Sequence, residues 1–118
     1  MAFAKQQMDD ILGKNPRGKS YMVSFGNKPP TQAHYRGACV PKMSPDKLVD
    51  RSMSFIYWYN AENSNPNELT GAIVGGPDRY DNFEDRCSTS SAMTEPTTYT
   101  NSLAIGVLAK LAKHHAQS

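Results

Sequence analysis

Apolar side chains recur at helical spacing near both ends of this chain, which predicts one α-helix at each end. In residues 2–12 the apolar positions fall on one face, and Lys, Gln and Asp side chains occupy the other. Gly13 follows as a C-terminal stop. Residues 102–113 carry a wider apolar stripe, and Thr100 or Asn101 can cap its start. The two stripes consist of Ala4, Met8, Ile11 and Leu12, and of Leu103, Ala104, Val107, Leu108, Leu111 and Ala112.

The long stretch between these helices has weak periodicity and frequent proline and glycine. Residues 52–59 suit either a buried helical turn or a short strand, and residues 69–74 are equally ambiguous. Long connections without structure are uncommon in compact domains, and two helices cannot bury both stripes against so much loop. We therefore expect residues 1–118 to be all-α and to form one end of a larger helical domain. Its long loops would form one face, where a site could lie.

The bulk composition argues against several classes of function. The chain has 118 residues, which suits one domain, and a formal net charge of +2, so no strong field draws it to nucleic acid or membrane. No apolar run approaches the roughly 20 residues of a membrane span. The first residues lack the apolar core and small-residue cleavage site of a signal peptide. We therefore see no targeting signal in the sequence.

Two cysteines, Cys39 and Cys87, lie far apart in the sequence. A single disulfide is one alternative if the protein is secreted, and two unpaired thiols are the other. No second Cys or His stands at ligand spacing beside either cysteine, so the sequence does not support a zinc site.

Acidic side chains concentrate between Gly71 and Asn101, where turn residues would hold the backbone exposed to a ligand. Glu95 stands alone among Ser, Thr, Ala and Met, so partial burial there would raise its pKa toward that of a general acid. Two acids in different environments are the minimum for acid/base chemistry on a glycosidic bond. Four other acids form either a charged, solvated loop or a calcium site, although their spacing does not match the helix-loop-helix calcium pattern. These four are Asp78, Asp81, Glu84 and Asp85.

Two other segments carry side chains that suit a sugar ligand. His34 and Arg36 fall on the same side of an extended segment, and both can donate to sugar hydroxyls or to an anion. A solvated loop with an incidental basic pair is the alternative. Trp58, between Tyr57 and Tyr59, could stack on a sugar, but aromatic clusters are more often core, and we favour a core position.

Residues 13–20, Gly-Lys-Asn-Pro-Arg-Gly-Lys-Ser, match the phosphate-binding loop pattern. That loop needs a strand before it and a helix after it, so that amides and the helix dipole converge on phosphate. Here a predicted helix precedes the match, and prolines 29 and 30 soon interrupt the segment after it. We therefore do not expect a nucleotide site.

Taken together, four blocks that span nearly the whole chain resemble the C-terminal portion of a glycoside hydrolase family nine catalytic domain, in particular that of plant endo-1,4-β-glucanases (cellulases). Both active-site signatures of that family are represented, in order and at nearly the expected separation. The blocks are residues 3–16, residues 20–37, residues 66–78, and residues 81–86 followed by 94–111.

The resemblance implies an (α/α)6 barrel whose long loops form a cellulose-binding cleft. His34 and Arg36 match the pair that contacts sugar near the cleavage point. Glu95 matches the proton donor, and Asp85 matches an aspartate that helps to organise the site. Hydrolysis in this family inverts the sugar: one acid protonates the leaving oxygen and a second carboxylate, about 6.5–9.5 Å away, activates water. The base lies in an Asp-rich segment near the start of the domain, which this chain lacks.

We therefore expect part of an endoglucanase that hydrolyses internal β-1,4-glucosidic bonds of cellulose or a related glucan, without cofactor or metal, and with little or no catalysis as an isolated chain. The resemblance implies secretion of the full-length protein. A non-catalytic carbohydrate-binding or interaction remnant is the alternative. Residues 87–93 lack the usual Asn-Tyr segment, and residues 40–65 follow the family poorly; the former favours this alternative, whereas the intact block 94–101 disfavours it.

Overall fold

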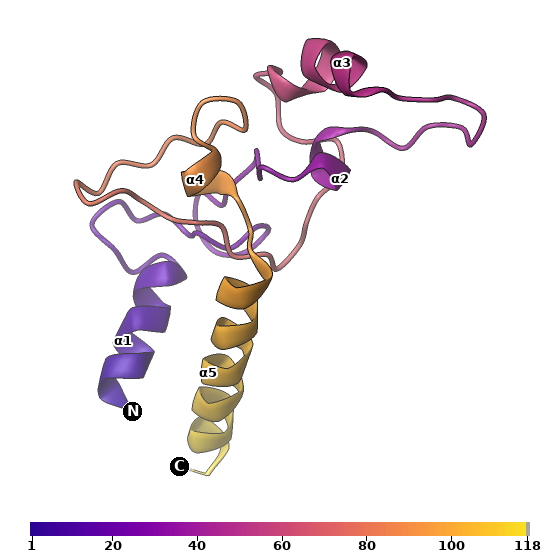
Figure 1. Cartoon of the computed structure of the whole chain (residues 1–118). Helices are drawn as coiled ribbons and strands as arrows, with labels where there is room; N and C mark the ends of the chain where they lie inside the picture. The colour runs from indigo at the N-terminus through magenta and orange to yellow at the C-terminus, as the bar shows by residue number, and fades with distance from the viewer. Residues whose placement is uncertain (118) are drawn as a thin grey trace.

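Two helices run alongside each other, and the irregular part of the chain lies at one end of the pair (Figure 1). The computed structural model describes residues 1–117. Helix α1 spans Ala2–Ile11 and helix α5 spans Thr98–Ala116, so both predicted helices are confirmed. Met8 of α1 and Ala104 of α5 are buried in the same hydrophobic cluster, which joins the two helices.

Helix α5 begins earlier than the sequence predicted. Its N-cap is Thr97, which is extended, and the first helical residue is Thr98 instead of Ser102. Pro96 sets the limit of the helix on the N-terminal side, because the residue before a proline is driven out of the α region. Glu95 is extended accordingly, with φ −77° and ψ 118°. The helix therefore begins two residues after the proline, with Thr97 as its N-cap.

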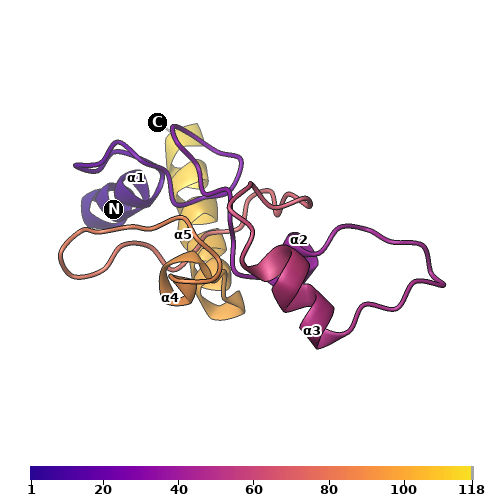
Figure 2. The ribbon, with the colours of Figure 1, turned by 90° about the horizontal axis from the view of Figure 1, so that it is seen from above.

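Short helical pieces interrupt the loops. They are α2 (Arg36–Cys39), α3 (Arg51–Ser54), the π-helical segment η1 (Phe55–Tyr59) that continues α3, and α4 (Ser91–Thr94). Asp50 caps α3 by accepting a hydrogen bond from the Met53 amide at 2.7 Å. The ambiguous residues 52–59 are thus helical. No residue of η1 is buried, so the core position that we favoured for Trp58 is wrong, because this arm extends away from the long helices (Figure 2).

No β-strand occurs within residues 1–117. The ambiguous residues 69–74 are not helical, and they take part in an isolated antiparallel bridge between Met22 and Ile73. The prediction of an all-α chain is therefore confirmed for the described part of the sequence. None of the helices in that part is long and apolar enough to cross a membrane.

Two small hydrophobic clusters hold the loops to the helices. One consists of Tyr21, Val23, Ala33 and Val74, and the other of Met8, Ile73 and Ala104. The predicted stripe of α5 is only partly confirmed. Val107, Leu108 and Leu111 pack on the second cluster, whereas Leu103 is 70% exposed. Helix α5 is apolar over more of its circumference than α1 can cover.

The chain is more extended than a compact domain of its length. The radius of gyration of its Cα atoms is 16.2 Å, against about 13.5 Å for a compact domain. Large apolar side chains stay exposed on both long helices, among them Phe3, Tyr99, Leu103 and Ile105. Solvated helix faces are normally polar. These faces therefore have the composition of helix surfaces that are covered by other elements.

Candidate active site

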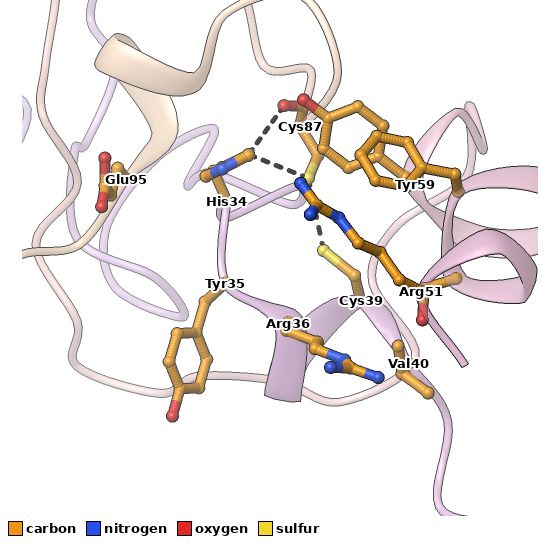
Figure 3. Close-up of a pocket in the computed structure, with 11 residues that line it drawn as sticks. His34, Tyr35, Arg36, Cys39, Val40, Arg51, Tyr59, Cys87 and Glu95 are labelled. Atoms are coloured by element: carbon orange, nitrogen blue, oxygen red, sulfur yellow. Dashed lines mark hydrogen bonds between the residues drawn. The ribbon is translucent and has the colours of Figure 1, made fainter. Parts of the chain in front are cut away.

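A cavity of about 440 Å³ lies between α2, the α3–η1 arm and the segment that leads into α5 (Figure 3). Three of the predicted site residues, His34, Arg36 and Glu95, line it, and Asp85 does not. The other lining residues are Tyr35, Cys39, Val40, Arg51, Ser54, Phe55, Tyr59 and Cys87. The fold thus gathers segments that are far apart in the sequence around one cavity.

His34 is half-buried and is held by its backbone and by its ring. Its amide donates to the Thr94 carbonyl at 2.9 Å. Its Nδ1 lies 2.9 Å from the Cys87 carbonyl oxygen, and its ring meets the Tyr59 ring edge-on, with centroids 5.7 Å apart. A proton on Nδ1 satisfies that carbonyl, which leaves Nε2 as the nitrogen available to a ligand. Figure 3 shows the imidazole between Glu95 on one side and Cys87 and Tyr59 on the other.

Asp85 does not line the cavity, but it binds the segment that leads to His34. Its Oδ2 accepts from the amide and the hydroxyl of Thr31 at 2.7 and 2.8 Å, and its Oδ1 accepts from the Gln32 amide at 3.1 Å. The Gln32 side chain in turn accepts a hydrogen bond from the Cys87 amide at 3.2 Å. Charge-assisted bonds to main-chain amides are strong and directional. Asp85 therefore acts on the cavity through His34 and Cys87 rather than by facing it.

Glu95 follows α4 directly and precedes Pro96. Thr94 beside it is fully buried, and its hydroxyl donates to the Ser90 carbonyl at 3.0 Å, which fixes the backbone at this point. The Glu95 side chain itself is exposed, so the partial burial that we expected is not present in this chain. The general-acid role of Glu95 stays a prediction.

Arg36 is exposed, and one of its terminal nitrogens donates to the Val49 carbonyl at 3.2 Å. A second guanidinium, that of Arg51, points into the cavity from α3 (Figure 3). It lies 5.9 Å from the Phe55 ring, within the range of a cation–π contact. Sequence reasoning did not single out Arg51, and it favoured a core position over sugar stacking for the nearby aromatic residues 57–59.

The two cysteine thiols lie side by side in the same wall. Their sulfur atoms are 3.3 Å apart, and both residues are buried. Cys87 Sγ is also 3.3 Å from His34 Nδ1. Burial, with the neighbouring Cys39 thiol, raises the pKa of Cys87 from 9.0 to about 12. Sequence reasoning named both cysteines but could not tell that they meet.

The four clustered acids do not converge. Asp78 accepts from the Tyr80 and Asn82 amides of its own turn, and the Asn82 amide is the main cause that lowers the pKa of Asp78. Glu84 accepts from the Ser90 hydroxyl at 2.6 Å, which lowers the pKa of Glu84. Among residues 1–117, no group of three or more His, Cys, Asp or Glu side chains is placed to hold a metal ion.

Residues 13–20, which match the phosphate-binding loop pattern, do not form a phosphate-binding site. Helix α1 precedes it, as predicted. The Ser20 side chain is fully buried, and its hydroxyl bonds to the Met22 backbone. The Lys19 ammonium donates to the Lys28 carbonyl at 2.7 Å and lies 5.0 Å from the Phe83 ring centroid. Both polar groups of the pattern are thus used within the fold.

Comparison with known proteins identifies close relatives. Endoglucanase 16 of Arabidopsis thaliana is 60% identical and Endoglucanase 8 of Oryza sativa subsp. japonica is 58% identical, each over 112 residues. Each alignment covers 95% of this chain, but only 23% and 22% of the respective relative. The chain therefore spans less than a quarter of the length of these plant endoglucanases.

Solved structures agree with this relationship. The cellulase Cel9M of C. cellulolyticum in complex with cellobiose matches with a TM-score of 0.74 and 32% identity, over 97% of this chain and 23% of that one. Endoglucanase CelQ from Clostridium thermocellum, complexed with cellobiose and cellotriose, matches with a TM-score of 0.72 and 35% identity, over 93% of this chain and 16% of that one. The chain thus corresponds to part of the (α/α)6 barrel. Because residues 1–108 also match the family model for glycosyl hydrolase family 9, the resemblance seen in the sequence is confirmed, and the chain belongs to that family.

Proposed function

We propose that this chain supplies the general-acid side of an endoglucanase that hydrolyses internal β-1,4-glucosidic bonds of cellulose or a related glucan with inversion. The observation that supports this most directly is that His34, Arg36 and Glu95 line one cavity. The related structures hold cellobiose and cellotriose, which are short β-1,4-glucans.

In this proposal each residue has a separate task. Glu95 protonates the glycosidic oxygen as the bond to the leaving sugar breaks. Nε2 of His34 and the guanidinium of Arg36 bind sugar hydroxyls, which orients the scissile bond. Asp85 holds the segment that carries His34 through its bonds to Thr31 and Gln32. The base that activates water on the opposite face belongs to a part of the enzyme outside these residues.

The isolated chain should consequently show little or no hydrolysis, because inversion needs two carboxylates on opposite faces of the sugar. Sugar binding without hydrolysis is the second candidate function. The exposed rings that line the cavity favour it: Tyr35 is 54% exposed and Phe55 is 42% exposed. Such rings can stack on a sugar whether or not catalysis follows.

The decisive experiment uses a full-length protein that contains this chain. Glu95→Gln should reduce turnover of cellulose by about a hundredfold or more. The loss should be much smaller on an aryl cellobioside whose leaving group needs no proton. Glu62→Gln is the matched control, because the Glu62 side chain is 80% exposed and pairs with Arg86 at the surface.

Equal losses on both substrates would show that Glu95 is not the acid. Binding of cello-oligosaccharide by the full-length protein with no turnover would favour the non-catalytic candidate. Turnover of soluble cellulose by the 118-residue chain alone would contradict the proposal that the catalytic base lies outside this chain.

Secretion of the full-length protein is part of the same proposal and rests on the family relationship. A cleavable signal peptide encoded in frame upstream of Met1 would support it. A full-length product that remains inside the cell would contradict it.

A further inference from the structure

We propose that Cys39 and Cys87 form a disulfide bond that cross-links α2 to the segment after Asp85 and so fixes the His34 wall of the cavity. The sulfur atoms are already 3.3 Å apart, and a disulfide bond is about 2.05 Å long. A closure of about 1.3 Å lies within the range of side-chain rotation.

Hydrogen bonds that do not involve the sulfur atoms hold the backbone segments that carry Cys39 and Cys87. Gln32 accepts from the Cys87 amide, and Asp85 accepts from the amides of Thr31 and Gln32. On the other side, the Cys39 amide donates to the Tyr35 carbonyl at 3.0 Å. Disulfides form without strain where the fold already brings the two residues together. Here several hydrogen bonds bring the two cysteines together, and none of these bonds involves a cysteine side chain.

A small oxidant can reach the pair. Cys39 and Cys87 are 8% and 3% exposed, yet both line the cavity of about 440 Å³ that opens beside His34. Burial also raises the pKa of Cys87. Because the thiolate is the attacking species, the reaction should be slow at neutral pH and faster at alkaline pH.

The oxidant in this proposal is a low-molecular-weight disulfide such as oxidised glutathione. One cysteine loses its proton, and its thiolate attacks a sulfur of the oxidant; the reagent's S–S bond breaks, and one small thiol leaves. The second cysteine then loses its proton and attacks the mixed disulfide, which releases the second small thiol. Two S–H bonds of the protein are replaced by one S–S bond, and two protons and two electrons pass to the reagent.

The cross-link would act on the site because Cys87 touches His34 directly. Its carbonyl oxygen is 2.9 Å from His34 Nδ1, and its sulfur is 3.3 Å from the same nitrogen. Cys39 closes α2, which begins two residues after His34. The bond would therefore tie the residue that touches the imidazole to the short helix that follows His34. It would form whether or not the full-length enzyme hydrolyses cellulose, so its test is independent of the proposed function.

The test measures the thiol–disulfide equilibrium of the 118-residue chain. The chain has only two cysteines, so any intramolecular disulfide is this one. The reduced chain is equilibrated with mixtures of reduced and oxidised glutathione, the remaining thiols are blocked with N-ethylmaleimide, and intact masses are recorded. We expect a species lighter by two hydrogens, with no maleimide and no glutathione attached.

The same titration in concentrated urea is the control for geometry. In the unfolded chain the two cysteines are 48 positions apart, so closure depends only on random encounter. We expect the equilibrium constant for the disulfide to be at least about tenfold higher in buffer than in urea. Equal constants in the two media, accumulation of glutathione adducts on both cysteines, or disulfide-linked dimers in buffer would each overturn the proposal.

A second readout reports on His34 itself. Histidine ring resonances of the reduced and oxidised chain are compared by NMR, with His34→Asn for assignment and with His114 and His115 as internal references at the far end of α5. Oxidation should move the His34 signal and leave the other two in place. Unchanged His34 signals in a chain that has formed the disulfide would overturn the claim that the bond fixes this wall.

Discussion

The backbone amide of His34 donates a hydrogen bond to the carbonyl of Thr94, the residue that directly precedes Glu95, with 2.9 Å between nitrogen and oxygen. This bond joins two segments that lie far apart in the sequence and that carry the two main candidates for the site. It involves only main-chain atoms. The spacing of His34 and Glu95 therefore depends on the fold of the loops and not on either side chain.

The carboxylate of Asp85 should be needed for stability as well as for the site. In Asp85→Asn an amide NH₂ would replace one of the oxygens that accept from Thr31 and Gln32. We expect the free energy of unfolding to fall by about 1–3 kcal/mol, measured by urea denaturation. Asp81→Asn is the control, because Asp81 has a positive φ of 62°, which asparagine tolerates. Equal losses in both variants would contradict this role of Asp85.

Asn101 should hold helix α5 to the extended segment beside it. Its side chain accepts from the Ile73 amide at 2.8 Å and donates to the Ile73 carbonyl at 2.9 Å. Asn101→Ala leaves both buried main-chain groups without their partner, so we expect a loss of about 2–3 kcal/mol in unfolding free energy. Ser102→Ala, which removes one bond on the exposed side of the helix, should change it by less than about 0.5 kcal/mol. The reverse order would show that Asn101 is not the anchor.

Two glycines should respond to alanine in opposite directions. Gly106 lies inside α5 with open space around its Cα, so Gly106→Ala should stabilise the helix by about 0.5–1 kcal/mol. A Cβ on Gly75 would collide with the carbonyl oxygen of Ala92 in α4, so Gly75→Ala should destabilise the chain. Thermal unfolding followed by circular dichroism measures both. A higher melting temperature for Gly75→Ala would refute the close packing of these segments.

The reduced protein should lose stability at alkaline pH. Burial raises the pKa of Cys87 from 9.0 to about 12, so the folded state favours the neutral thiol. The contribution of the neutral Cys87 thiol to stability is fully present below pH 9. It is lost as the pH rises toward 12, because the thiol ionises at a lower pH in the unfolded chain than in the folded chain. Unfolding free energies measured across this window should fall more steeply for the reduced chain than for Cys87→Ser or the oxidised chain. Parallel pH profiles would contradict the shift.

Helical spacing was sufficient to locate α1 and α5, because their apolar positions repeat with the period of the helix. It was not sufficient to tell which part of the apolar stripe on α5 is covered. Within the predicted stripe Val107 and Leu108 pack on the core, whereas Leu103 is exposed. A helix that is apolar over most of its surface fits more than one neighbour. Only the position of α1 decides which side is covered.

The two long helices, the family, and the choice of His34, Arg36, Asp85 and Glu95 as candidates could all be predicted from the sequence, because helical periodicity and motif residues are local properties of the chain. Three other features were visible only in the folded chain: Asp85 bonds to the segment before His34, none of the aromatic residues of η1 is buried, and Cys39 meets Cys87. Each of these depends on how loops distant in the sequence are placed. Loops have no periodicity from which such placement could be deduced.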